Sequence, residues 1–189
     1  MKRLLDIVIS GASLIVLWPV FIVVAVAVRR TMGAPVIFRQ NRPGRNGRVF
    51  TMFKFRTMRD GHGPDRERLT STGRFLRSTS LDELPELLNV LRGEMSIVGP
   101  RPLLVEYLPL YSAHHARRHE VRPGLTGLAQ VSGRNDTSWS ERLDLDVEYV
   151  DTRSMLLDLR IIALTALKVL KREGVEAPGE ATMPRFTGS

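Results

Sequence analysis

Residues 7–28 read IVISGASLIVLWPVFIVVAVAV, an almost wholly apolar segment close to the start of the chain. About 20 consecutive apolar residues are enough for a helix to cross a bilayer, so a single membrane-spanning helix is one interpretation. A signal peptide does not fit, because the segment is too long and Arg29 and Arg30 follow it directly. The segment predicts insertion into a membrane.

The flanking charges and a central proline favour a re-entrant hairpin over a straight span. Basic residues stand on both sides of the apolar segment: Lys2, Arg3, Arg29 and Arg30. The positive-inside rule then places both ends on the cytoplasmic side, which one straight helix cannot satisfy. Pro19 lacks a backbone N–H and pushes Trp18 away from α geometry. We therefore expect a re-entrant membrane helical hairpin over residues 1–30, with its bend at Trp18 and Pro19.

Asp6 lies at the edge of the apolar segment. It is a candidate ion-pair partner for Lys2 or Arg3. Alternatively, Asp6 is a solvated charge in the first helical turn, where an acidic residue interacts favourably with the helix dipole. The sequence leaves both interpretations open.

The charge balance of the chain indicates an anionic partner. The 189 residues carry 28 Lys and Arg against 20 Asp and Glu, a formal net charge of +8. Phosphorylated substrates, an anionic membrane and nucleic acid all fit this balance. Nucleic acid is disfavoured, because only 6% of residues are aromatic and no nucleic-acid-binding motif is recognised. The absence of cysteine excludes disulfides, thiolate metal sites and a cysteine nucleophile.

Hydrophobic periodicity beyond the apolar segment predicts a small mixed domain. Strands are expected over 36–38 and 49–55, and helices over 84–91, 103–120, 139–149 and 155–172. Polar, Gly- and Pro-rich loops or turns are expected over 41–48, 59–73 and 122–127.

The expected fold class is therefore α+β and mostly helical, with three parts. The hairpin over 1–30 is followed by a globular domain over 31–172, with short strands and amphipathic interfacial helices, and by a loose tail over 173–189. The last helix has a broad apolar face and suits either the core or the bilayer interface.

Residues 80–85, SLDELP, contain adjacent carboxylates, Asp82 and Glu83, for which capping and catalysis are both open. With Ser80 as N-cap, Glu83 falls at N3 and completes a capping box, but Pro85 then lies where its missing N–H costs a helical bond. With Asp82 as N-cap, Pro85 falls at N3 and Glu83 is free for chemistry. A free carboxylate can hold Mg²⁺, act as a general base, or attack phosphorus to give an acyl phosphate.

Several basic residues stand beside glycine, proline or a strand end, where loops meet on a rigid scaffold. They are Lys54, Arg56, Arg101, Arg122 and Arg134. Arginine forks and lysine point charges both bind phosphate. Together with the two carboxylates they indicate a site for a doubly phosphorylated, metal-bound substrate, although no Walker loop or G-x-G-x-x-G motif is present. The four histidines show no metal-ligand spacing and are interpreted as surface residues.

Five stretches resemble the bacterial sugar transferase family, and more narrowly its small monotopic phosphoglycosyl transferases. They are KRLLDIVIS, the central WP, FKFRTM, TSLDELPELLNVLRGEMSIVGPRPLL and RPGLTGLAQVSGRN, and with the last helix they extend the resemblance to about residue 172. The segment between FKFRTM and RLTSTG is shorter than in many relatives, which affects the shape of that loop rather than the chemistry.

The resemblance implies an activity and roles for matching residues. Such enzymes transfer a sugar 1-phosphate from a UDP-sugar to a polyprenol phosphate such as undecaprenyl phosphate, release UMP, and start glycoconjugate assembly in the cytoplasmic leaflet of the bacterial inner membrane. Asp82 matches the nucleophile and Glu83 the acid associated with Mg²⁺. Lys54 and Arg134 match phosphate-binding positions, and Arg101 lies near the nucleotide. Membrane lipids and a homo-oligomer are further expected partners.

Two other functions are open. A polyprenol glycosyltransferase would pass on only the sugar and release UDP. A basic, membrane-tethered binding module would have no turnover at all. The sequence names neither the sugar, the polyprenol length nor the pathway.

Overall fold

The computed structural model describes residues 2–132, 138–171 and 185–188, and within these ranges the protein is mostly helical. Two small sheets are present, each with two strands. The α-helices are α1 Lys2–Met32, α2 Asp65–Arg68, α3 Ser71–Ser78, α4 Glu86–Arg92, α5 Ala113–Ala116, α6 Leu128–Ser132, α7 Trp139–Thr152 and α8 Met155–Lys171. The strands are β1 Ile37–Pro43, β2 Val49–Phe55, β3 Ser96–Val98 and β4 Gly124–Thr126. The 3₁₀ turns are Arg45–Gly47, Leu81–Glu83, Val105–Leu110 and Arg117–Glu120.

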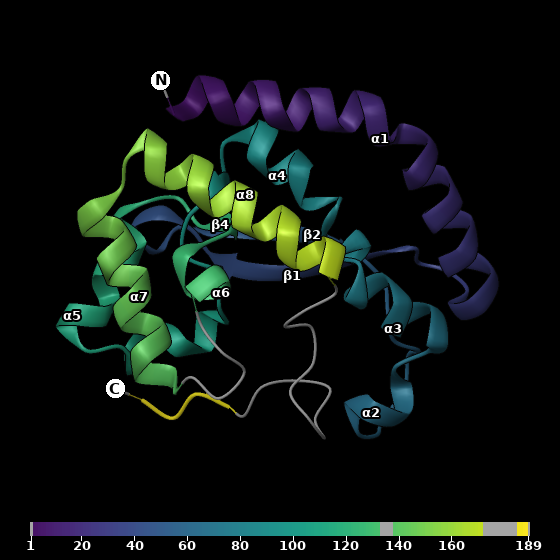
Figure 1. Ribbon diagram of the computed structural model, residues 1–189. Helices are drawn as coiled ribbons and strands as arrows, with labels where there is room; N and C mark the ends of the chain where they lie inside the picture. The colour runs from purple at the N-terminus through teal and green to yellow at the C-terminus, as the bar shows by residue number, and fades with distance from the viewer. Residues whose placement is uncertain (1, 133–137, 172–184, 189) are drawn as a thin grey trace.

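The apolar segment forms one helix, α1, that continues through Pro19. Figure 1 shows the helix bending midway: its first half runs beside α4 and its second half turns down toward α3. Trp18 and Pro19 are both exposed. The bend agrees with the loss of one backbone donor at proline, but the helix resumes at once and does not double back into two parallel arms.

The two halves of α1 pack against different parts of the domain. Val24 and Val28 of the second half are buried in a cluster with Phe55 and Leu76. Much of the remaining apolar surface of the helix is exposed, as at Ile15, Val16, Trp18 and Val23. By length and composition α1 is the one described helix able to cross a membrane.

Asp6 has neither of the environments expected for it. Its carboxylate is 2% exposed and accepts hydrogen bonds from the Ser96 hydroxyl and the Ile97 backbone N–H, both at 2.9 Å. Lys2 instead pairs with Asp158 of α8 at 2.5 Å. Arg3 donates to the carbonyls of the last turn of α4. Ser96 and Ile97 are about 90 residues away in the sequence, so local sequence could not reveal them as the partners of the Asp6 carboxylate.

The strands β1 and β2 form an antiparallel hairpin from Ile37↔Phe55 to Pro43↔Val49. The predicted strand over 49–55 is confirmed, whereas the strand predicted over 36–38 extends to Pro43. Asn46 and Gly47, at φ 56° and 72°, make the tight turn between them. The hairpin places Lys54 near the end of β2.

The strands β3 and β4 pair in parallel and bring two proline-containing motifs together. The Gly99 N–H donates to Thr126 and the Gly124 N–H to Pro100, at 2.9 and 3.0 Å. A Cβ on Gly124 would lie 2.1 Å from the Gly99 nitrogen, so only glycine allows this approach. The turn predicted over 122–127 is thus partly a strand, and it fixes the backbone before Arg101.

The helices at 84–91 and 139–149 are confirmed as α4 and α7, but the single helix predicted over 103–120 is wrong. Pro109 interrupts this segment, and Ser112 caps the short helix α5 by accepting from the His115 N–H. The loop predicted over 59–73 contains α2 and the start of α3.

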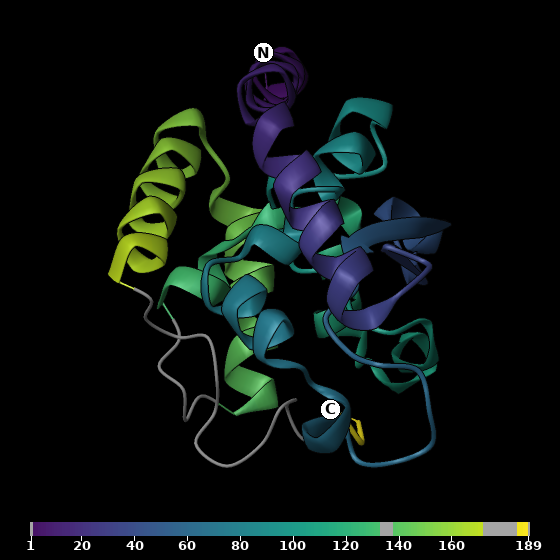
Figure 2. The same ribbon diagram turned by 90° about the vertical axis from the view of Figure 1, so that its right-hand side faces the viewer.

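Helix α8 lies at the outer edge of the molecule (Figure 2). Ile161 packs into the main core, which also contains Val90 and Tyr149. Leu156 and Leu170 are each 79% exposed, so much of its apolar face is not covered by the described protein.

Candidate functional site

The two adjacent carboxylates of the SLDELP segment lie in a 3₁₀ turn that precedes α4. Ser80 has left-handed geometry, φ 54°, and its side chain caps nothing. Pro85, rather than Asp82, occupies the N-cap position of α4. Neither capping arrangement open from the sequence is therefore present. Asp82 is buried, with 7% of its surface exposed.

Lys54 and Arg101 converge on Glu83. The Lys54 ammonium, from β2, lies 2.7 Å from Glu83 Oε1. Arg101, from the segment after β3, makes a hydrogen-bonded ion pair with the same oxygen. The structure thus brings together Lys54, Glu83 and Arg101 from three separate segments.

Glu86 is a member of this cluster that sequence reasoning missed. Its side chain is 2% exposed and its Oε1 lies 3.0 Å from the Lys54 ammonium, an ion pair without hydrogen-bond geometry. The available signal was its spacing, since Glu86 follows Glu83 by three residues and this separation places side chains on one face of a helical turn. Lys54 therefore serves two carboxylates.

The environment shifts the pKa values of Asp82, Glu83 and Glu86 in different directions. Burial and the neighbouring charge of Glu83 raise the pKa of Asp82. Burial also acts to raise the pKa of Glu83, but Arg101 and Lys54 outweigh it and hold that pKa far below its ordinary value. Burial raises the pKa of Glu86 to about 7. Glu83 is thus a fixed anion, while Glu86 gains or loses a proton near neutral pH.

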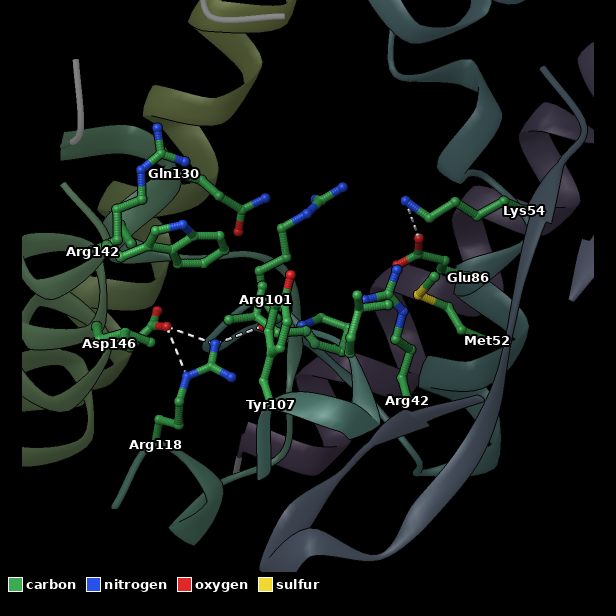
Figure 3. Close-up of a pocket in the computed structure, with 16 residues that line it drawn as sticks. Arg42, Met52, Lys54, Glu86, Arg101, Tyr107, Arg118, Gln130, Arg142 and Asp146 are labelled. Carbon is green, nitrogen blue, oxygen red and sulfur yellow. Dashed lines mark hydrogen bonds and ion pairs between the residues drawn. The ribbon is translucent and has the colours of Figure 1, made fainter. Parts of the chain in front are cut away.

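A cavity of about 390 Å³ opens beside this cluster, and Figure 3 shows Lys54 and Glu86 across it from Gln130 and Arg142. Arg101 projects into the cavity between them. Asp82 and Glu83 are not lining residues; Glu83 connects to the cavity through Lys54 and Arg101. The remaining wall is basic and apolar, formed by Arg42, Met52, Pro102, Leu103, Leu104, Tyr107, Arg118, Ala129, Trp139, Leu143 and Asp146.

One wall is held by a buried ion pair. Arg118 pairs with Asp146 of α7 at 2.7 Å and also donates to the Arg101 carbonyl at 2.7 Å. The backbone of Arg101 is thus fixed by the same side chain that anchors α7. Such a cavity, with basic groups and an apolar wall, suits a ligand that carries phosphates and a ring.

Two other basic residues named from the sequence lie elsewhere. Arg56 is 6% exposed and donates to the carbonyls of Met32 and Ala34, so it ties the end of α1 to β2. Arg122 donates to the Gly93 carbonyl at 2.8 Å, at the end of α4. Arg134 lies outside the described residues. Of the four basic candidates that the structure describes, Lys54 and Arg101 are those that lie at the carboxylates.

The acidic residues fit a magnesium ion. Mg²⁺ prefers oxygen ligands and is commonly held by one or two carboxylates together with substrate phosphates and water. Glu83 meets both of its cationic partners through Oε1, which leaves Oε2 outside these two contacts. Asp82 adjoins it in the same turn. Two carboxylates beside a basic cavity are thus a suitable donor set.

Comparisons with known proteins agree on one family. The family model described as bacterial sugar transferase matches residues 1–172. An uncharacterized sugar transferase, EpsL of Bacillus subtilis, is 53% identical, over 100% of this chain and 96% of its own length. A UDP-glucose:undecaprenyl-phosphate glucose-1-phosphate transferase of Xanthomonas campestris is 45% identical, over 89% of this chain. The galactosyl transferase CpsE of Streptococcus agalactiae is 40% identical, over 93% of this chain. The match covers only 38% and 43% of these last two proteins.

Proposed function

The chain belongs to the bacterial sugar transferase family and is an enzyme of that family, and we propose that it moves a sugar 1-phosphate from a UDP-sugar to undecaprenyl phosphate with release of UMP. The observation that carries the proposal is the pairing of Glu83, which directly follows Asp82, with Lys54 and Arg101, two residues that line a basic cavity. The name of the Xanthomonas relative supports both substrate classes, and that of the Streptococcus relative supports transfer of a sugar. The product would be the first membrane-bound intermediate of a polysaccharide or another glycoconjugate.

Asp82 is the proposed nucleophile. One of its carboxylate oxygens attacks the phosphorus that bears the sugar, the bond from that phosphorus to the UMP oxygen breaks, and UMP leaves. The phosphosugar is then joined to Asp82 as an acyl phosphate. An oxygen of undecaprenyl phosphate attacks the same phosphorus, which frees the Asp82 carboxylate and forms the lipid diphosphate sugar. The raised pKa of Asp82 makes its ionised form the more basic nucleophile.

The neighbouring residues have positioning and electrostatic roles in this proposal. Lys54 and Arg101 hold Glu83 and present positive charge where the donor's phosphates would bind. Glu83, with Asp82, would hold Mg²⁺, which supplies charge neutralisation to a diphosphate when bound. The cavity wall around Tyr107 and Trp139 offers an apolar surface for the nucleoside end of the donor.

The membrane placement belongs to the same proposal. We infer that α1 enters the bilayer from the cytoplasmic face of the inner membrane and returns to it, because both of its ends carry basic residues and its middle is bent and apolar. The exposed leucines of α8 would lie at the bilayer interface.

The test is an assay of nucleotide release with a panel of UDP-sugars and undecaprenyl phosphate in membrane nanodiscs. UMP should appear with at least one donor, and Asp82→Asn should abolish turnover, while Glu148→Gln, on the exposed surface of α7, should not change it. Release of UDP would indicate a glycosyltransferase instead. Incubation with the donor alone should add a sugar phosphate to the peptide that contains Asp82. Product formation without that adduct would refute the covalent route.

A further inference from the structure

Three potential metal ligands, His114, His115 and Asp144, meet between α5 and α7, and none of them lines the cavity. One ring nitrogen from each of His114 and His115 and a carboxylate oxygen of Asp144 all lie within 4.8 Å of one another. Asp144 Oδ1 is 3.2 Å from His114 Nε2 and 3.0 Å from His115 Nε2. The two helices lie side by side at this end of the molecule (Figure 1).

These distances are close to those of a metal coordination shell. In a tetrahedral site with bonds of about 2.0 Å to nitrogen and oxygen, neighbouring ligand atoms are roughly 3.3 Å apart. Both Asp–His separations already have this value within a few tenths of an ångström. The His114 side chain is 55% exposed, so it has room to adjust its position around a bound metal.

The positions of the ligand side chains and the charge of Asp144 also favour metal binding. The interpretation of all four histidines as surface residues is wrong for His115, which is 6% exposed. Its burial restricts the ring, and its backbone N–H donates to the Ser112 hydroxyl. Hydrogen bonding from His115 holds the pKa of Asp144 below its ordinary value, which keeps the carboxylate ionised at neutral pH. The positive charges nearby are compensated, since Arg117 pairs with Asp151 and Arg118 with Asp146.

We propose that His114, His115 and Asp144 form a binding site for a first-row divalent transition metal such as Zn²⁺, separate from the reaction centre. Two imidazoles and one carboxylate suit Zn²⁺, Ni²⁺ or Cu²⁺ and not Mg²⁺, which prefers an all-oxygen shell. The bound metal replaces the two N–H···O hydrogen bonds and links α5 directly to α7. Because Asp146 lies two residues after Asp144, the metal stabilises the helix that carries one wall of the cavity. Water fills the remaining coordination position on the exposed side.

The experiment measures zinc binding by untagged, metal-free full-length protein in detergent, by calorimetry and by thermal unfolding. One zinc ion per chain should bind, and it should raise the unfolding temperature, because at 100 times Kd a bound ligand shifts the folding equilibrium about 100-fold. Replacing Zn²⁺ by Co²⁺ should give the visible absorption of a coordinated cobalt ion. Mg²⁺ at the same concentration should not displace the cobalt.

Matched variants assign the site. His114→Gln and Asp144→Asn, both at half-exposed positions, should fold normally by circular dichroism. Each should weaken zinc binding at least about 10-fold, since even outer-shell changes have effects of that size. His62→Gln, an exposed histidine in the loop before α2, should leave zinc affinity unchanged. The proposal is overturned if wild-type protein binds no zinc, or if His114→Gln and Asp144→Asn bind it as tightly as His62→Gln does.

Discussion

Lys54 Nζ lies 2.7 Å from Glu83 Oε1, so a residue of β2 holds the carboxylate that immediately follows the proposed nucleophile Asp82. Arg101 contacts the same oxygen from the segment after β3. The 3₁₀ turn that contains both carboxylates is thus fixed between two sheets.

Lys54→Met should lower the rate of UMP release at least about 100-fold, because loss of one well-placed donor to a developing charge has an effect of this size. It also leaves Glu86 without its cationic partner. Arg48→Met, at an exposed position before β2, is the matched control and should keep near-normal turnover. A Lys54→Met rate within threefold of the control would show that the Lys54–Glu83 contact has no role in catalysis.

Glu86 should make the stability of the protein depend on pH. Its pKa is raised from an ordinary 4.5 to about 7 by burial, so between these values the folded state binds more protons than the unfolded state. Stability should therefore fall as pH rises from about 4.5 to about 7, by up to about 3 kcal/mol from this group. Glu86→Gln should remove this part of the dependence.

Unfolding temperatures at pH 5 and pH 8 would measure the effect, with Glu148→Gln as control. Glu86→Gln and wild type should be similarly stable at pH 5, and the variant should be the more stable at pH 8. Equal changes with pH in all three proteins would show that Glu86 is ionised throughout. Because Asp82 contributes in the same direction, the comparison between variants, and not the wild-type curve alone, isolates Glu86.

The sequence correctly predicted the strand and the helix whose residue patterns are regular over seven or more residues. Alternation gave the strand over 49–55, and helical spacing ended by Gly93 gave α4 to within two residues. The strands β3 and β4 were missed because each has three residues, and such short strands form only through pairing with a distant segment. The segment 103–120 was wrongly predicted as one helix, because its apolar residues have helical spacing although Pro109 interrupts it.

For the candidate site, the structure brings some of the residues predicted from the sequence together and places others elsewhere. Asp82, Glu83, Lys54 and Arg101 were all identified from sequence, and the structure places them in one cluster. Arg56 has the same kind of sequence context, beside a strand end, but its guanidinium binds main-chain carbonyls. Arg56 and Arg101 both have glycine, proline or a strand end as sequence neighbours. Only the three-dimensional structure shows that Arg101 faces the cavity, whereas Arg56 donates hydrogen bonds to main-chain carbonyls.

This distinction predicts different phenotypes for Arg56 and Arg101. Arg56→Met removes the guanidinium that donates to the Met32 and Ala34 carbonyls and pairs with Asp60, and should destabilise the protein by about 1–3 kcal/mol, with kcat per folded molecule nearly unchanged. Arg101→Met should lower kcat/KM at least about 10-fold with a smaller loss of stability. Thermal unfolding and initial rates on the same preparations would compare them. A rate loss in Arg56→Met equal to that in Arg101→Met would place Arg56 in the substrate site after all.

Asp6 is a buried polar connection between α1 and β3. Its carboxylate accepts from Ser96 and from the Ile97 N–H at the start of β3, both at 2.9 Å. In Asp6→Ala these buried donors lose their acceptor, at a cost of about 1–3 kcal/mol. For a chain of this size such a loss lowers the unfolding temperature by roughly 2–4 °C per kcal/mol. Asp6→Asn keeps an acceptor oxygen and should lose less.

The two variants at Asp6 distinguish a specific contact from a general effect of charge. Both remove the negative charge from the first turns of α1, but only alanine removes the acceptor. Thermal unfolding in nanodiscs should therefore rank wild type above Asp6→Asn and Asp6→Ala last. Because β3 leads directly to Gly99 and Arg101, Asp6→Ala should also slow UMP release more than Asp6→Asn does. Equal stability of the two variants would mean that the charge itself, rather than the hydrogen bonds to β3, holds α1 in place.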